Sequence, residues 1–164
     1  MSNTSQSASA RLEQPQPEQP QPKAAHPKAA QRKPTLRIPP NCDLTLGIVC
    51  VDKPEPGVTV WRMTAGEHLA NPIGVVQGGF VAAFADTAMA SSTITNLAGR
   101  KAYTANTEMK ISFVRAAPVG EPLTCTARVI GGGSRITFVE AEVSDGAGNL
   151  IAKASSTYLL TPRE

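Results

Sequence analysis

The sequence predicts an α+β domain in which one long helix packs against an antiparallel sheet. Residues 78–97 predict the helix, because they contain no proline, are rich in alanine and carry apolar side chains almost all round. A helix of that kind is buried on most sides. Four alternating runs follow it, separated by regularly spaced turn signals that are typical of an antiparallel meander. One buried helix and one antiparallel sheet form the layers of an α+β fold.

The segments before the helix suit strands joined by turns. Residues 44–51 (LTLGIVCV) are apolar enough for a short helix end that leads into a strand, and residues 54–57 (PEPG) form a turn. Residues 58–63 alternate between two faces, as a strand does. Residues 68–74 (HLANPIG) are expected to form a loop, because the Asn71-Pro72 step disfavours helix.

The central helix is expected to begin at Gly78-Gly79 and to end near Gly99. Four strands are expected after it, of which the last alternates least cleanly: residues 103–114, 123–130, 135–144 and 150–160. Turns separate these strands at residues 118–120, 131–133 and 145–149. The glycine turn at 131–133 is not a phosphate loop, since the Lys-Ser/Thr ending is missing, and a hairpin is expected there.

The first 36 of the 164 residues are expected to lie outside the domain, which covers residues 37–164. Residues 1–36 consist largely of Pro, Gln, Ala and Lys and have almost nothing to bury, so a disordered tail is predicted. The tail could be a docking or tethering arm, or a dispensable extension. It carries five basic and two acidic side chains and so accounts for the net charge of +3. The domain has no excess positive charge, and nucleic acid is not expected as a partner.

The remaining composition favours a cytoplasmic protein without a membrane partner. No apolar run approaches the roughly 18–20 residues of a membrane span. The three cysteines form no CxxC pair, and their odd number argues against a disulfide framework. Cys125 is expected to be a small core residue. The two histidines cannot build a metal site, and no metal or cofactor is expected.

Asp86 stands out, because it lies in the middle of the apolar helix. No cation occupies the positions three or four residues away, so the helix cannot neutralise the carboxylate locally. Asp86 could be solvent-exposed on a narrow polar stripe, or it could lie at a cleft with a chemical function. Gly78 lies eight residues earlier, at a helix start whose free N–H groups can bind an oxyanion.

Eight residues of helix span about 12 Å, so one helix cannot place Gly78 and Asp86 on one small substrate. A second chain that presents its helix antiparallel to the first could bring one protomer's glycine to the other protomer's Asp86. The site hypothesis therefore predicts an oligomer.

The segment NPIGVVQGGFVAAFADTA resembles the PaaI-type acyl-CoA thioesterases of the hot-dog superfamily. Asn71, Gly78, Gly79 and Asp86 fall on the family pattern, and TEMKISFVRAAPVGEPLTCTARVI looks like two of its strands. The resemblance implies an antiparallel five- or six-stranded sheet wrapped around one long central helix. It also implies a homo-oligomer, a dimer or a dimer of dimers (a homotetramer), with active sites at the dimer interface.

The resemblance further implies hydrolysis of acyl-CoA, with Asp86 as nucleophile or general base. The Gly78 N–H, together with that of Gly79, would be the oxyanion donor, and Asn71 would orient the water or the thioester. Asn106 or Thr107 lies where the family often has a Ser or Thr that touches the carboxylate from the partner chain. Many members have His before the glycine pair; here Gln77 can hydrogen-bond the thioester but cannot titrate.

The roles of some other residues remain open. Arg115, Ser134 and Arg135 could touch the CoA phosphates or be ordinary surface residues. His68 could pair with Asp86 or be a solvated loop residue. Two alternative functions remain open. The first is a hot-dog hydratase or dehydratase, which would need a catalytic His that is not evident here. The second is an acyl-CoA-binding protein without catalysis, which would have no reason to keep a carboxylate beside the thioester.

Overall fold

The computed structural model describes residues 38–163. The tail predicted over residues 1–36 lies outside the described residues. The elements that the structure contains, in chain order, are α1 (Asn41–Leu46), β1 (Ile48–Glu55), β2 (Val58–Thr64), the 3-10 turn η1 (Glu67–Leu69), α2 (Gly78–Thr95), β3 (Ala102–Phe113), β4 (Pro122–Gly132), β5 (Ile136–Ser144) and β6 (Leu150–Pro162). The predicted long helix is confirmed, although it ends at Thr95 and Gly99 lies in the turn that follows.

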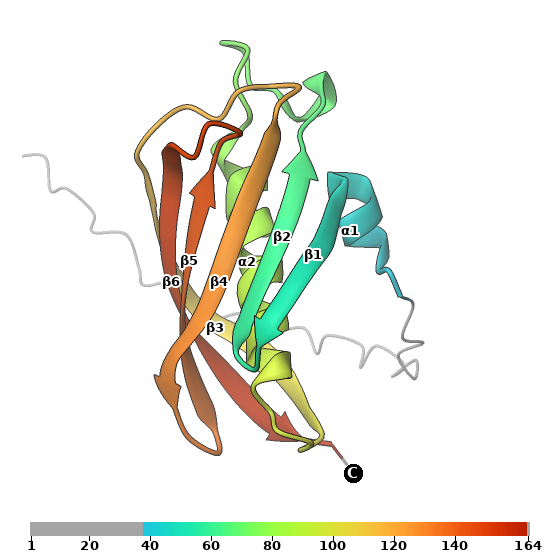
Figure 1. Cartoon of the computed structure of the whole chain (residues 1–164), viewed down its shortest axis with the longest axis vertical. Coiled ribbons are helices and arrows are strands. Elements are labelled where there is room, and N and C mark those ends of the chain that lie inside the picture. The colour runs from blue at the N-terminus through green and yellow to red at the C-terminus, as the bar shows by residue number, and fades with distance from the viewer. Residues whose placement is uncertain (1–37, 164) are drawn as a thin grey trace, which may run out of the picture. The chain divides into compact units, whose positions relative to one another are not determined.

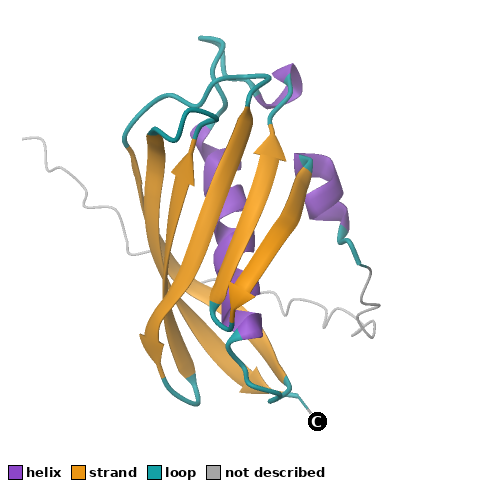
Figure 2. Cartoon of the chain, in the orientation of Figure 1, coloured by secondary structure: helices purple, strands orange, loops and turns teal. Residues whose placement is uncertain are grey.

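The six strands form one antiparallel sheet in the order β1-β2-β4-β5-β6-β3. Helix α2 runs along one face of this sheet, as Figures 1 and 2 show. The expected antiparallel sheet of five or six strands with one long helix is therefore confirmed, with six strands. None of the helices described over residues 38–163 is long and apolar enough to span a bilayer.

The meander expected after the helix is wrong for its first strand. Only β4, β5 and β6 follow one another in the sheet, whereas β3 pairs with the outer edge of β6. Residues 114–121 do not make a hairpin, because the part of this segment from Ala117 onward bonds to segments before the helix. The Val76 N–H donates to the Ala117 carbonyl, and the Gly120 N–H donates to the Ala65 carbonyl. These bonds carry the chain across to β2, where β4 begins.

The turn expected at residues 54–57 is shorter than predicted. Pro54 and Glu55 still belong to β1, and only Pro56 and Gly57 turn. Proline is tolerated there because β1 is an edge strand with irregular pairing between Asp52 and Glu55.

Helix α2 is buried on the side that meets the sheet and open on the other. Its buried apolar residues are Val81, Phe84, Ala85, Ala88 and Met89. Burial of each large side chain among them stabilises the fold by about 1.5–3 kcal/mol, because it removes apolar surface from water. On the opposite side, Gly79 is exposed and Ala83, Asp86 and Ala90 are partly exposed. The helix is thus less buried in one chain than its composition predicts.

Candidate active site

The carboxylate of Asp86 is held by two neutral donors that come from two neighbouring strands. Asn106 on β3 donates from Nδ2 to Oδ1 over 2.6 Å, and the Tyr158 hydroxyl on β6 donates to the same oxygen over 2.5 Å. In the described part of the chain, the ion pairs are made by Arg128 and Lys153 and do not involve Asp86. Hydrogen bonds from neutral groups therefore replace the cation that the helix lacks.

The orientation of the Asn106 amide is set by its other partners. Its Oδ1 accepts the Glu108 N–H over 3.1 Å and lies 2.9 Å from the Ser156 hydroxyl, which also has the Glu108 carbonyl within 2.7 Å. Because that oxygen accepts the Glu108 N–H, the NH₂ group must face Asp86. Asn106 lies opposite Tyr158 while Glu108 lies opposite Thr157, so Thr107 is the extra residue of a β-bulge.

Thr107 does not reach the carboxylate. Its hydroxyl donates to the Thr157 carbonyl over 2.8 Å, and its side chain is exposed. Of the two neighbours that the sequence proposed, Asn106 is the one in contact with Asp86. This contact forms within one chain, whereas the resemblance implied a contact from the partner chain.

Tyr158 and Ser156 were missed by the sequence analysis. Tyr158 is only 1% exposed, and burial, followed by the neighbouring Asp86, raises the pKa of its phenol well above the usual range. The phenol is therefore a hydrogen-bond donor at any ordinary pH. One signal was present in the sequence: the last strand alternates poorly because it contains the polar run Ser155-Ser156-Thr157 before this tyrosine.

The start of α2 forms the second part of the candidate site. Gln77 is the N-cap residue, makes no capping hydrogen bond with its side chain and is exposed. A Cβ atom on Gly78 would lie 3.1 Å from Cζ of Phe113, whereas a Cβ atom on Gly79 would meet nothing within 4 Å. The Phe113 ring therefore covers the first residue of the helix and leaves the second open.

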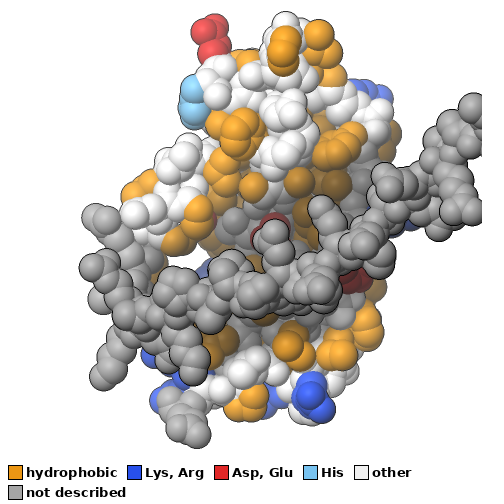
Figure 3. Space-filling model, turned by 180° about the vertical axis from the view of Figure 1, so that it is seen from behind, with side chains coloured by type: hydrophobic (Ala, Val, Ile, Leu, Met, Phe, Trp, Pro, Cys, Tyr) orange, Lys and Arg blue, Asp and Glu red, His pale blue; other side chains and the backbone are white. Residues whose placement is uncertain are grey.

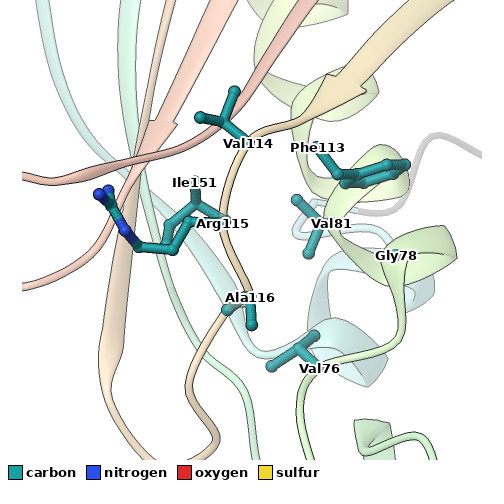
Figure 4. A pocket seen from close by; sticks show the side chains of 9 residues that line it. Val76, Gly78, Val81, Phe113, Val114, Arg115, Ala116 and Ile151 are labelled. Carbon is teal, nitrogen blue, oxygen red and sulfur yellow. The ribbon is translucent and has the colours of Figure 1, made fainter.

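A cavity of about 310 Å³ adjoins this helix start. Its lining is mostly apolar and comes from α2 and the loop before it, from the end of β3 and the residue after it, and from β6: Val76, Gly78, Val81, Phe113, Val114 and Ile151. Figure 4 shows Phe113, Val81 and Gly78 on one side of this cavity. Seen from behind the sheet, apolar side chains gather in the upper half of Figure 3, the half in which Figure 1 places the N-terminal end of α2.

Asn71 organises the loop that leads into α2. Its Oδ1 accepts the N–H groups of Ile73 over 3.0 Å and Val75 over 3.3 Å. The loop then returns to η1, where the Gln77 N–H donates to the Leu69 carbonyl over 2.9 Å. Asn71 thus fixes the entry of the helix through its carbonyl oxygen. Its predicted role toward water or thioester stays a prediction.

The residues proposed for CoA phosphates are not gathered in one chain. Arg115 lines the cavity, but its Nη1 donates to the Leu150 carbonyl over 3.2 Å and the side chain extends away from Gly78 in Figure 4. The Ser134 carbonyl accepts Arg100 Nη1 over 3.5 Å, near the C-terminal end of α2. Arg135 is exposed beside it. Since an 18-residue helix spans about 27 Å, Ser134 lies far from Gly78.

The hypothesis that His68 pairs with Asp86 finds no supporting contact in this structure. His68 is exposed in η1 and is not among the hydrogen-bond partners of Asp86 in the described chain. Cys125 is buried, as expected of a core residue. Within residues 38–163 no group of three or more possible metal ligands comes together.

Comparison with known proteins agrees with the fold. The family model of the thioesterase superfamily matches residues 73–152. Human acyl-coenzyme A thioesterase 13 is 27% identical over 118 residues, which are 71% of this chain and 83% of that protein. Among solved structures, the E. coli PaaI protein shares the fold with a TM-score of 0.68 and 24% identity, over 74% of this chain and 84% of its own.

A second solved structure is closer in sequence. The phenylacetic acid degradation-related protein of Ralstonia eutropha JMP134 is 30% identical, with a TM-score of 0.67, over 73% of this chain and 89% of its own. By fold and by sequence similarity, this chain belongs to the thioesterase superfamily as a PaaI-type hot-dog thioesterase.

Proposed function

We propose that this chain hydrolyses acyl-CoA thioesters and that Asp86 is its essential carboxylate. The observation that carries the proposal is a partly exposed carboxylate in an apolar helix, held by Asn106 and Tyr158 and paired with no cation in the described chain. Such a carboxylate has no cation beside it to occupy it, and it lies at the open side of α2, where a substrate could reach it. The human relative named for acyl-coenzyme A supports the substrate class.

In the reaction a C–O bond forms at the thioester carbon, the C–S bond breaks and CoA leaves as a thiolate, which takes up a proton that derives from the water consumed. As a general base, Asp86 would take a proton from the attacking water. As a nucleophile, it would attack the carbon itself and form an anhydride that water then hydrolyses. In both routes the carbonyl oxygen becomes negative, and the free N–H of Gly78 at the start of α2 would stabilise it.

The distance between these groups requires a second chain. Gly78 and Asp86 are separated by about 12 Å of helix, so we propose a homo-oligomer in which each site combines Asp86 of one protomer with Gly78 of the other. Two features support this arrangement. The open side of α2 carries small residues such as Gly79 and Ala83 that allow close approach, and β3 is an edge strand of 12 residues that can pair with another copy.

The test is thiol release from phenylacetyl-, benzoyl-, hexanoyl- and palmitoyl-CoA by the purified full chain. We expect stoichiometric release of CoA and free acid from at least one of these substrates. Release from none of them, by a folded protein, would contradict the proposed activity and favour an acyl-CoA-binding protein.

A further inference from the structure

The two oxygens of the Asp86 carboxylate have unequal surroundings. Oδ1 accepts hydrogen bonds from Asn106 Nδ2 and from the Tyr158 hydroxyl. Within the described residues, no hydrogen bond reaches Oδ2. A carboxylate held through one oxygen by two donors cannot rotate freely, so its second oxygen keeps a fixed direction.

Tyr158 has only one hydroxyl proton and two acceptors within reach. The Asp86 carboxylate oxygen lies 2.5 Å away, and the main-chain carbonyl oxygen of the same residue lies 3.0 Å away. The shorter distance is typical of an O–H group that donates to a charged oxygen. The phenol proton therefore belongs to the carboxylate, and the carbonyl is a secondary neighbour.

The surroundings of the phenol suit a permanent donor. Burial, followed by the neighbouring Asp86, raises the pKa of Tyr158, so the hydroxyl keeps its proton throughout the ordinary pH range. The residue is 1% exposed and lies on β6, with its hydroxyl against the Asp86 carboxylate. It touches the carboxylate without being accessible to a substrate.

We propose that Tyr158 is a positioning residue, which together with Asn106 fixes Oδ1 of Asp86 and leaves Oδ2 as the oxygen that acts on the thioester. This inference rests on the proposed function of Asp86. Nothing in the family resemblance assigns a role to Tyr158. A loosened carboxylate would still leave the substrate-binding surface intact, so the loss should fall on the chemical step.

The kinetic test is Tyr158→Phe, which removes the hydroxyl and keeps the ring. We expect kcat to fall about 10- to 100-fold while KM changes by less than about twofold. Tyr103→Phe is the matched control, because Tyr103 is the other of the two tyrosines and is half exposed on β3. It should have wild-type kcat. An unchanged kcat in folded Tyr158→Phe, or a loss confined to KM, would overturn the positioning role.

A spectroscopic test does not depend on turnover or on how Tyr158→Phe folds. Protein labelled with ¹³Cζ-tyrosine gives two signals, one for each tyrosine. Asp86→Asn should move the Tyr158 signal and leave the Tyr103 signal in place. If neither signal moves, the phenol donates to the main chain and the inference is wrong. A wild type that hydrolyses no thioester would instead overturn the proposed function, and the catalytic role of Tyr158 with it.

Discussion

Asn106 and Tyr158 lie directly opposite each other on β3 and β6, and both donate to the same carboxylate oxygen of Asp86. The two residues are 52 positions apart in sequence, on strands that are adjacent in the sheet. The β-bulge at Thr107 follows Asn106 directly and turns the Glu108 N–H toward the side-chain oxygen Oδ1 of Asn106. The sheet thus presents two neutral donors to a helix that offers no cation of its own.

Asn106→Asp should lower kcat by about 100-fold or more. The substitution keeps the shape of the side chain, removes the NH₂ donor and places a second carboxylate beside the first, and like charges at such distances repel. Thr107→Val is the neighbouring comparison, because it removes only the hydroxyl bond to the Thr157 carbonyl. Steady-state kinetics of both variants would show which neighbour acts on Asp86; an equal loss in the two would contradict the assignment to Asn106.

The oxyanion role of Gly78 is separable from its size. Gly78→Ala adds a Cβ atom against Phe113 but keeps the N–H, whereas Gly78→Pro adds that carbon as part of its ring, with Cγ and Cδ, and removes the N–H. Proline is tolerated at the first helical position, and Gln77 before it already has extended backbone, with ψ 129°. We expect kcat of the Pro variant to lie about 10²- to 10³-fold below that of the Ala variant. Equal kcat values would show that this N–H is not the donor.

Mixed oligomers would reveal whether the site is shared between chains. A heterodimer of Gly78→Pro with Asp86→Asn contains one intact site and one doubly damaged site if each site combines two chains. Purified through two different tags, it should recover about half of the wild-type activity, as two-fold symmetry requires. If each site lies within one chain, both sites are damaged and the heterodimer stays inactive.

Burial of Cys125 should make stability fall at alkaline pH. Burial raises the pKa of this thiol from 9.0 to about 12, so the folded protein keeps a proton that the unfolded chain releases. The free energy of unfolding should therefore decline between about pH 9 and 12, by up to about 1.4 kcal/mol per pH unit from this group. Denaturant unfolding at pH 8.5, 9.5 and 10.5 should show a shallower decline in Cys125→Ala. If the free energy of unfolding declined equally in the wild type and in Cys125→Ala, the decline would not come from Cys125.

Much of the fold could be predicted from the sequence because its signals are local. The alanine-rich run 78–95 and the glycine turns mark α2 and the hairpins without reference to the rest of the chain. The place of β3 beside β6 could not be predicted in this way, because the alternating pattern of a strand does not show which edge of the sheet that strand joins. The crossing segment at residues 114–121 resembles an ordinary turn in sequence, and only its bonds to residues before the helix reveal the crossover.

The carboxylate of the candidate site could be picked out from the sequence, whereas the side chains that hold it could not. Asp86 is conspicuous because its neighbours along the helix are apolar and carry no charge. Asn106 was found only to within one residue, because the bulge at Thr107 breaks the alternation that would fix the strand's faces. Tyr158 was missed because its contact depends on two strands and the helix together. The sequence placed Ser134 and Gly78 in one candidate site. In the structure Gly78 begins α2, whereas Ser134 lies near the other end of that helix.

The most direct test of the central claim is thiol release by folded Asp86→Asn, compared with wild type and with Asp52→Asn, which changes an exposed aspartate on β1. The amide keeps the shape of the side chain but can act neither as base nor as nucleophile. We expect kcat of Asp86→Asn to fall by about 10³-fold or more, with Asp52→Asn like wild type. An Asp86→Asn protein that hydrolyses its thioester at the wild-type rate would contradict the assignment of Asp86 as the essential carboxylate.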